Sequence, residues 1–188
     1  MSVEPNVLEV NDLVVEAATR HGKVTIVDGV SLSIAPGQTL GLVGESGSGK
    51  SMTALAILRL LGNGVRISSG QVSIQGTDLT ALNPEQMRQI RGNQVGMIFQ
   101  EPMTALDPAY TVGEQIAQGV RTHLGLPRKK AWARAVEMLD RVGIPSADKR
   151  AKDYPHHFSG GMRQRVVIAI ALACEPALLL ADEPTTAL

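Results

Sequence analysis

The sequence is poor in aromatic residues, has one cysteine and carries no net charge. Aromatic residues make up 3% of the 188 residues, which argues against a surface that stacks on nucleic-acid bases. Lys and Arg together number 18, as do Asp and Glu, so no basic field points to nucleic acid. The single Cys174 excludes an internal disulfide and fits a reducing compartment. We therefore expect no nucleic-acid partner and a buried, unreactive thiol.

Long hydrophobic runs are also missing. The longest apolar run covers residues 166–174, whereas a membrane-spanning helix needs about 20 apolar residues. The opening MSVEPNVLEVND has no basic flank followed by an apolar block, so we expect no signal peptide. A hydrophobic content of 44% indicates a globular protein. We expect one domain that reaches a membrane only through a partner.

Hydrophobic periodicity divides this single domain, residues 1–188, into three parts. Residues 1–100 show the short apolar segments of a β subdomain and an α/β core. Residues 101–157 show helical spacing broken by prolines, which predicts a small helical lobe. Residues 158–188 predict a helix at about 160–173 and a strand at 177–182. The strands expected in the first part are 7–17, 24–34, 38–44, 71–76 and 94–100.

The segment GESGSGKS matches the pattern G-x-x-x-x-G-K-[ST] in full. A predicted strand precedes it and a predicted helix follows it, which is the context in which this pattern binds phosphate. Its glycines let backbone N–H groups face an anion at a helix N-terminus. Lys50 would serve the β- and γ-phosphates, and the Ser51 hydroxyl is a hard oxygen ligand for Mg²⁺. The predicted nucleotide-binding loop comprises Gly44, Glu45, Ser46, Gly47, Ser48, Gly49, Lys50 and Ser51.

Two adjacent acids follow the apolar run LLLA near residue 182. In phosphate-loop sites a carboxylate at the end of a nearby strand holds the Mg²⁺ shell, and Asp182 has that position. Glu183 lies at the strand tip, where it could turn toward the γ-phosphate and polarise a water. Acids after a strand are common on protein surfaces, so this pair gains its meaning from the phosphate loop.

FSGGMRQR, residues 158–165, lies between the loop and the acidic pair. A Ser–Gly–Gly sequence that opens a helix forms a second anion-binding N-terminus. One chain then has two phosphate-facing features but one lysine-bearing loop. This favours two chains that each offer the serine–glycine turn to the nucleotide of the other. The alternative is ordinary capping by Ser159 with glycines for packing, and the spacing alone leaves both open.

Together these motifs resemble the nucleotide-binding subunit of an ABC transporter, over the whole chain. GESGSGKS resembles the Walker A motif, IFQEP (98–102) the Q-loop, FSGGMRQR the signature motif and LLLADEP the Walker B motif. FQEPMTALDPAYTVGEQI and YPHHFSGGMRQRVVIAIALACEP resemble most closely the peptide/nickel importer group. The resemblance implies an α/β fold: a P-loop NTPase core with a mainly parallel sheet, an N-terminal antiparallel β subdomain and an inserted helical lobe, incomplete at the C-terminus.

The resemblance also implies roles for the matching residues. Glu183 would position the attacking water, and Lys50 and Gln100 would complete the catalytic set. Mg²⁺ would be held by Ser51, Gln100 and Asp182, and Gln100 would mark the hinge to the helical lobe. The γ-phosphate of an opposing subunit would be bound by Ser159, Gly160 and Gly161.

The partners implied are integral-membrane permease subunits, a second ATP-binding subunit and, indirectly, an external solute-binding protein. The segment after Gln100 would form the groove for a coupling helix of the permease. The expected location is the cytoplasmic face of the inner membrane, as a peripheral subunit, with ATP and Mg²⁺ as ligands.

The chain departs from the family pattern at Ala17, where an aromatic residue usually stacks on adenine. Losing a stacked ring costs on the order of 1–3 kcal/mol by analogy with base stacking elsewhere. We therefore expect weaker ATP binding or looser base selectivity, which Ala17→Tyr should correct.

A second departure follows TTAL, where the family has an aspartate, a strand and a switch histidine. In this class that strand lies between the Walker B strand and the strand before the phosphate loop. Unpaired buried backbone groups cost about 1–3 kcal/mol each, against a total stability of about 5–15 kcal/mol. A chain that ended at Leu188 would therefore be unstable or aggregation-prone, and inactive as an ATPase.

Three functions remain open from the sequence. The first is an ATP-hydrolysing subunit that powers import of a solute, peptide or nickel. The second is a soluble ABC-type ATPase outside transport, which copurification with membrane subunits would exclude. The third is an inactive nucleotide-binding fragment, which nucleotide binding without hydrolysis would support.

Overall fold

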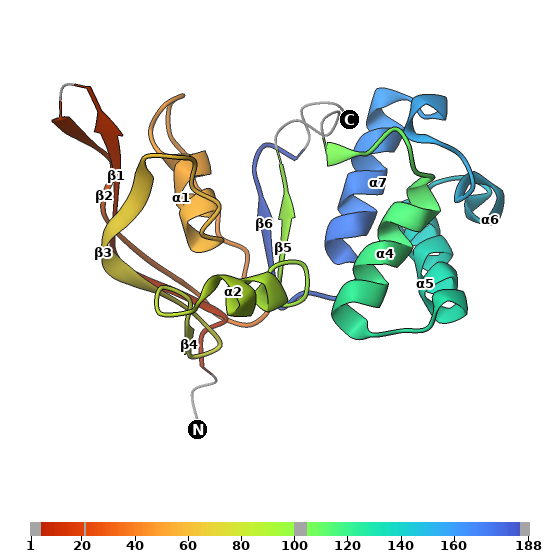
Figure 1. The fold of residues 1–188 in the computed structure, drawn as a ribbon, viewed down its shortest axis with the longest axis horizontal. Helices are drawn as coiled ribbons and strands as arrows, with labels where there is room; N and C mark the ends of the chain where they lie inside the picture. The colour runs from red at the N-terminus through yellow and green to blue at the C-terminus, as the bar shows by residue number, and fades with distance from the viewer. Residues whose placement is uncertain (1–4, 21, 100–104, 185–188) are drawn as a thin grey trace. The chain divides into compact units, whose positions relative to one another are not determined.

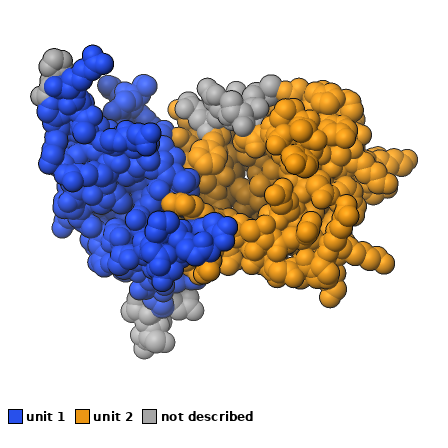
Figure 2. All heavy atoms as spheres, in the orientation of Figure 1, with its two compact units in different colours: residues 1–88 blue, residues 89–188 orange. Residues whose placement is uncertain are grey.

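The computed structural model describes residues 5–20, 22–99 and 105–184. Two compact units make up the chain, residues 1–88 and 89–188 (Figure 2). None of the helices in the described part of the chain is both long and apolar enough to cross a membrane. The boundaries expected at residues 100 and 157 stay predictions.

The first unit is built on an antiparallel sheet with strand order β2-β1-β3-β4 (Figure 1). Apolar residues alternate along β1, and Leu8, Val10, Leu13 and Val15 are all buried, as expected for a strand with one face on a core. The strands are β1 (Leu8–Thr19), β2 (Gly22–Ile34), β3 (Val65–Ile74) and β4 (Thr77–Asp78).

Two helices accompany this sheet. Helix α1 (Lys50–Ile57) packs against β2 and β3, and its Ala56 and Ile57 are buried. Helix α2 (Pro84–Ile90) follows β4. Its first turn is fixed by reciprocal capping, in which Asn83 N donates to Gln86 Oε1 and Gln86 N donates to Asn83 Oδ1, both at 2.9 Å, a capping box.

The strand predicted at residues 38–44 is wrong. No strand is formed between Ala35 and Gly49, and Val43 is 98% exposed. A strand exists by hydrogen bonding to a neighbour, and none of the described strands pairs with this segment.

The second unit combines a parallel strand pair with helices. Strands β5 (Val95–Ile98) and β6 (Leu178–Ala181) pair in parallel, from Val95 opposite Leu178 to Ile98 opposite Ala181. Helix α7 packs against β5 on one side and against α4 and α5 on the other (Figure 1). The helical elements are α4 (Val112–Leu124), α5 (Arg128–Arg141), α6 (Ala147–Arg150), the short 3₁₀ helix η1 (Pro155–His157) and α7 (Gly160–Leu172).

One core joins these helices. The buried faces of α4 and α5 present residues at helical spacing, among them Ile116, Val120, Ala135 and Leu139, which is the pattern of amphipathic helices. Helix α7 contributes Val166 and Ala169 to the same core. The helix predicted at about 160–173 is thus found, and it lies deep in this unit.

Close backbone contact joins α7 to the strand pair. A Cβ atom placed on Gly96 of β5 would lie 2.6 Å from the carbonyl oxygen of Ala171, closer than atoms pack. Glycine therefore allows α7 to approach β5. Cys174, just after α7, is buried as predicted, and burial raises the pKa of its thiol.

Candidate functional site

The phosphate-loop residues form a tight turn before α1. Gly47 and Gly49 have φ angles of 83° and 91°, a region that residues with a Cβ atom rarely enter. A Cβ atom on Gly49 would also lie 3.0 Å from the carbonyl oxygen of Ile26 in β2. The loop conformation therefore depends on glycine at both positions.

Lys50 folds back over this loop. Its Nζ donates to the carbonyl oxygens of Gly44 and Glu45, both at 2.8 Å. An ammonium group has three N–H donors, so one donor and the positive charge stay available to an anion in the loop.

The N-terminus of α1 also has donors to offer. In the described part of the chain, the backbone N–H groups of Gly49, Lys50 and Ser51 have no acceptor, and Gly49 makes no side-chain cap. Unpaired N–H groups at a helix N-terminus favour a bound anion. Together with Lys50 and the exposed Ser51 hydroxyl, this donor set fits a polyphosphate with its Mg²⁺.

The acidic pair lies at the carboxyl end of β6. The ladder with β5 continues one step past the strands, because Asp182 N donates to the carbonyl oxygen of Ile98 at 3.0 Å. Glu183 has φ 48°, a left-handed conformation that turns the chain at this point. Asp182 is half-buried and Glu183 is exposed. The carboxyl ends of β5 and β6 meet at one sheet edge, as parallel pairing requires.

Gln164 on α7 contacts the segment that follows β6. The sequence motifs do not indicate this contact. The side chain of Gln164 is 2% exposed, and its Nε2 donates to the carbonyl oxygen of Pro184. Its Oε1 is buried and finds no donor among the described residues. The helix that opens with the serine–glycine turn is thereby tied directly to the segment that bears Asp182 and Glu183.

The serine–glycine turn caps α7. Ser159 is the N-cap residue, and its side chain accepts a hydrogen bond from Met162 N at 3.4 Å. A Cβ atom on Gly160 would meet nothing within 4 Å, so packing among residues 5–20, 22–99 and 105–184 does not require glycine there. Ser159 and Gly160 are both exposed, and Gly161 lies in the first turn of the helix.

Two groups of predicted site residues fall in different units. The phosphate loop belongs to the first unit, and the acidic pair and the serine–glycine turn belong to the second. Gln100 lies outside the described residues, although β5 ends two residues before it. The structure thus defines two part-sites, one made of N–H donors and a lysine, the other of carboxylates and a capped helix.

These features agree with comparisons with known proteins. The family model for the ABC transporter matches residues 27–186, which covers most of the chain and includes both part-sites. The chain therefore belongs to the ABC transporter family.

The names of curated relatives indicate which kind of ABC transporter subunit this chain resembles. Proteins of Brucella melitensis and Brucella abortus that are named peptide import ATP-binding proteins are each 52% identical to this chain. The alignments cover 100% and 96% of this chain but 57% and 54% of the two relatives. The chain thus spans about half the length of the curated relatives it matches.

Solved structures share the fold. A dimeric ATP-binding cassette in a post-hydrolysis state, bound to ADP and Pi, has a TM-score of 0.85 and 28% sequence identity. A second dimeric structure of a bacterial ABC transporter cassette gives the same values. Each match covers 96% of this chain and 75% of the other. With the antiparallel N-terminal sheet, the parallel pair and the helices, this confirms the predicted fold class.

Proposed function

We propose that the complete protein binds and hydrolyses ATP to power peptide import through an ABC transporter. The observation that carries this proposal is the donor set at the start of α1. Three N–H groups without acceptors in the described chain lie beside a lysine that keeps one donor available. Such a set favours an anion that carries phosphate groups.

The loop residues 44–51 would hold the phosphates. Lys50 would place its positive charge on the β- and γ-phosphates, already oriented by its two bonds to loop carbonyls. Ser51, Asp182 and Gln100 would hold Mg²⁺, which supplies charge neutralisation at the phosphates when bound.

Glu183 would position and polarise the attacking water. Its left-handed backbone turns the chain directly after β6, which frees its side chain from the strict alternation of a strand. Gln164 would keep that turn in place through Pro184. Catalysis would then rest on positioning and charge stabilisation of a loose phosphoryl-transfer transition state.

Ser159, Gly160 and Gly161 would bind the γ-phosphate held by a second ATP-binding subunit. The open space at Gly160 supports this role over ordinary capping, because none of the residues that the structure describes makes a glycine necessary there. Two matched solved cassettes are dimeric, which fits such an arrangement.

The other partners we propose are permease subunits in the inner membrane, with this subunit on the cytoplasmic face and an external solute-binding protein acting indirectly. The names of the curated relatives favour peptide over nickel as the solute. Transport by the complete protein tests this in vesicles that contain its membrane subunits.

The expected result is peptide uptake and peptide-stimulated ATP hydrolysis that Lys50→Ala abolishes and that the exposed control Lys149→Ala leaves intact. Nickel uptake in place of peptide uptake would refute peptide as the transported solute. Hydrolysis by a protein that never copurifies with membrane subunits would refute transport and favour the soluble ATPase.

A further inference from the structure

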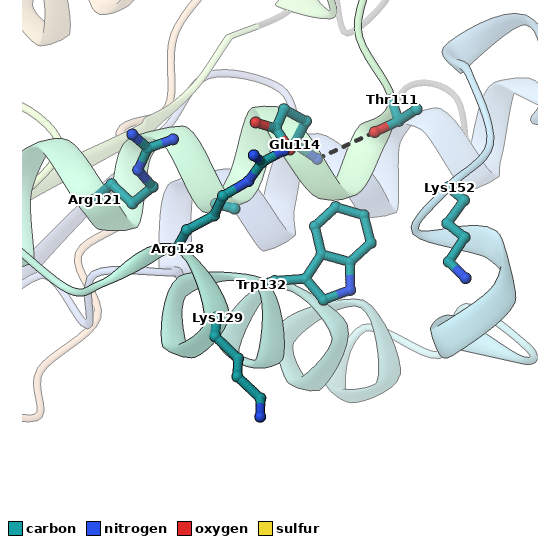
Figure 3. Close-up of a pocket in the computed structure, with 8 residues that line it drawn as sticks. Thr111, Glu114, Arg121, Arg128, Lys129, Trp132 and Lys152 are labelled. Atoms are coloured by element: carbon teal, nitrogen blue, oxygen red, sulfur yellow. Dashed lines mark hydrogen bonds between the residues drawn. The ribbon is translucent and has the colours of Figure 1, made fainter.

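A cavity of about 610 Å³ lies in the helical part of the second unit, apart from every residue proposed for ATP chemistry. One face of α4 from Thr111 to Arg121, the start of α5 and the segment at residue 152 form its walls (Figure 3). Cavities of about 300–1,000 Å³ accommodate drug-sized ligands. The side chains that matter for its chemistry are Glu114, Arg121, Arg128, Lys129, Trp132 and Lys152.

The aromatic wall of this cavity is fixed by packing. A Cβ atom on Gly113 would lie 2.9 Å from Cη2 of Trp132 and 2.6 Å from the carbonyl oxygen of Ala151. The backbone supports this arrangement, since Gly113 N donates to Ala151 O at 2.9 Å. The indole is therefore held between α4 and α5 and leaves part of its surface to the cavity, where Figure 3 shows it.

Positive charge is concentrated around this indole. Four cations and one carboxylate line the cavity, in a chain whose total charge is zero. Among the described residues, none of the four cations takes part in a salt bridge, whereas Arg88, Arg134 and Arg150 each have an acidic partner. Cations without an acidic partner are available to pair with an anion in the cavity.

The side chains of this cluster come from different elements. In Figure 3, Arg128 reaches from α5 toward Glu114 on α4, and Lys152 lies on the other side of the indole. Lys129 points away from the others. Arg121 and Arg128 can each offer two N–H groups to one anionic group.

We propose that this cavity binds a small organic anion. Its phosphate or carboxylate group would be held by Arg121 and Arg128, and its flat apolar part would lie against Trp132. The cavity offers one aromatic wall and a few cations beside it, which favours a small molecule over an extended acidic segment of a partner protein. This site is independent of the proposed ATPase function.

Trp132 gives a direct assay, because it is the one tryptophan in these 188 residues. The complete protein is titrated with phenyl phosphate while its tryptophan fluorescence is recorded, and Trp132→Phe supplies the blank. All measurements use a Lys50→Ala background, which removes the main cation of the phosphate loop. Inorganic phosphate and phenol, which each carry half of the probe's chemistry, are titrated in parallel.

We expect a saturable change with phenyl phosphate, a weaker response to inorganic phosphate and none to phenol at the same concentration. Arg121→Gln with Arg128→Gln should weaken binding by about tenfold or more, since each change removes charge-assisted hydrogen bonds. The matched control is Arg66→Gln with Arg88→Gln, which makes the same charge change in the first unit and should leave the affinity unchanged.

Three results would overturn the proposal. The first is a response to phenyl phosphate that does not saturate. The second is equal weakening by the control pair, which would indicate a general charge effect. The third is a response to a synthetic Glu-rich peptide without any response to phenyl phosphate, which would make the cavity a protein-docking surface.

Discussion

Replacing Gly96 with alanine tests the packing of helix α7 against the parallel strands β5 and β6. The new Cβ atom would lie 2.6 Å from Ala171 O and 3.1 Å from both Leu179 Cδ1 and Pro176 Cγ. Carbon and oxygen atoms in favourable contact stay about 3.3–3.6 Å apart. The helix α7 and strand β5 must therefore separate by several tenths of an ångström, and the contact atom is backbone, which cannot rotate away.

Two opposing effects set the size of the change in the free energy of unfolding. Overpacking of a close contact costs about 1–3 kcal/mol, while removal of a glycine from a strand returns about 0.5–1 kcal/mol. We expect Gly96→Ala to lower the free energy of unfolding by about 1–2 kcal/mol. Because Gly96 lies on β5, which pairs with β6 and packs against α7, ATP hydrolysis should fall as well.

Urea unfolding of the complete protein measures this, with Gly119→Ala as the matched control. Gly119 lies within α4, and a Cβ atom there meets nothing within 4 Å. That variant should gain up to about 1 kcal/mol from helix propensity. If Gly96→Ala were as stable as Gly119→Ala, the close approach of α7 and β5 would be refuted.

Three further predictions concern single residues. Gln164→Met removes the amide that donates to the carbonyl oxygen of Pro184 and should slow ATP hydrolysis more than it weakens ATP binding. An unchanged turnover number would show that this contact does not position Asp182 and Glu183. Cys174 should react with a thiol reagent more slowly than free cysteine at pH 8, because burial raises its pKa and lowers its thiolate fraction, and it should react fast only after unfolding. Ala17→Tyr should improve ATP affinity, since a stacked ring adds about 1–3 kcal/mol, and GTP affinity is measured beside it; an ATP affinity that does not rise would contradict the placing of Ala17 at the base.

Local signals in the sequence predicted several elements closely. The helical spacing within residues 101–157 appears as α4, Val112–Leu124, and α5, Arg128–Arg141. Their apolar spacing and their bounding Pro and Gly residues are properties of neighbouring residues alone. The capping box that opens α2 is equally local, and reading the spacing from Asn83 to Gln86 would have found that helix.

Features that depend on distant partners could not be read in this way. The strand expected at 38–44 is absent because a strand requires a neighbour, and the apolar run alone does not supply one. The first half of β3, from Val65, was missed because this segment is polar and pairs with β1 across register shifts. Gln164 was missed because its partner, Pro184, lies 20 residues along the chain.

The candidate site shows the same division. The loop at 44–51 is a contiguous motif, so its residues could be identified before its shape was known. The bond from Lys50 back to its own loop and the left-handed turn at Glu183 are matters of three-dimensional structure. The cationic cavity around Trp132 brings together three segments that no motif connects.

The measurement that tests the central claim most directly is ATP binding and turnover by the complete protein carrying Glu183→Gln. This change keeps the size of the side chain and removes the charge that would polarise the water. We predict that ATP still binds at the loop, because Lys50 and the N–H groups of α1 are untouched, while hydrolysis falls by at least about 10²-fold. Turnover equal to that of the unmodified protein would contradict the assignment of Glu183 and with it the proposed catalytic site.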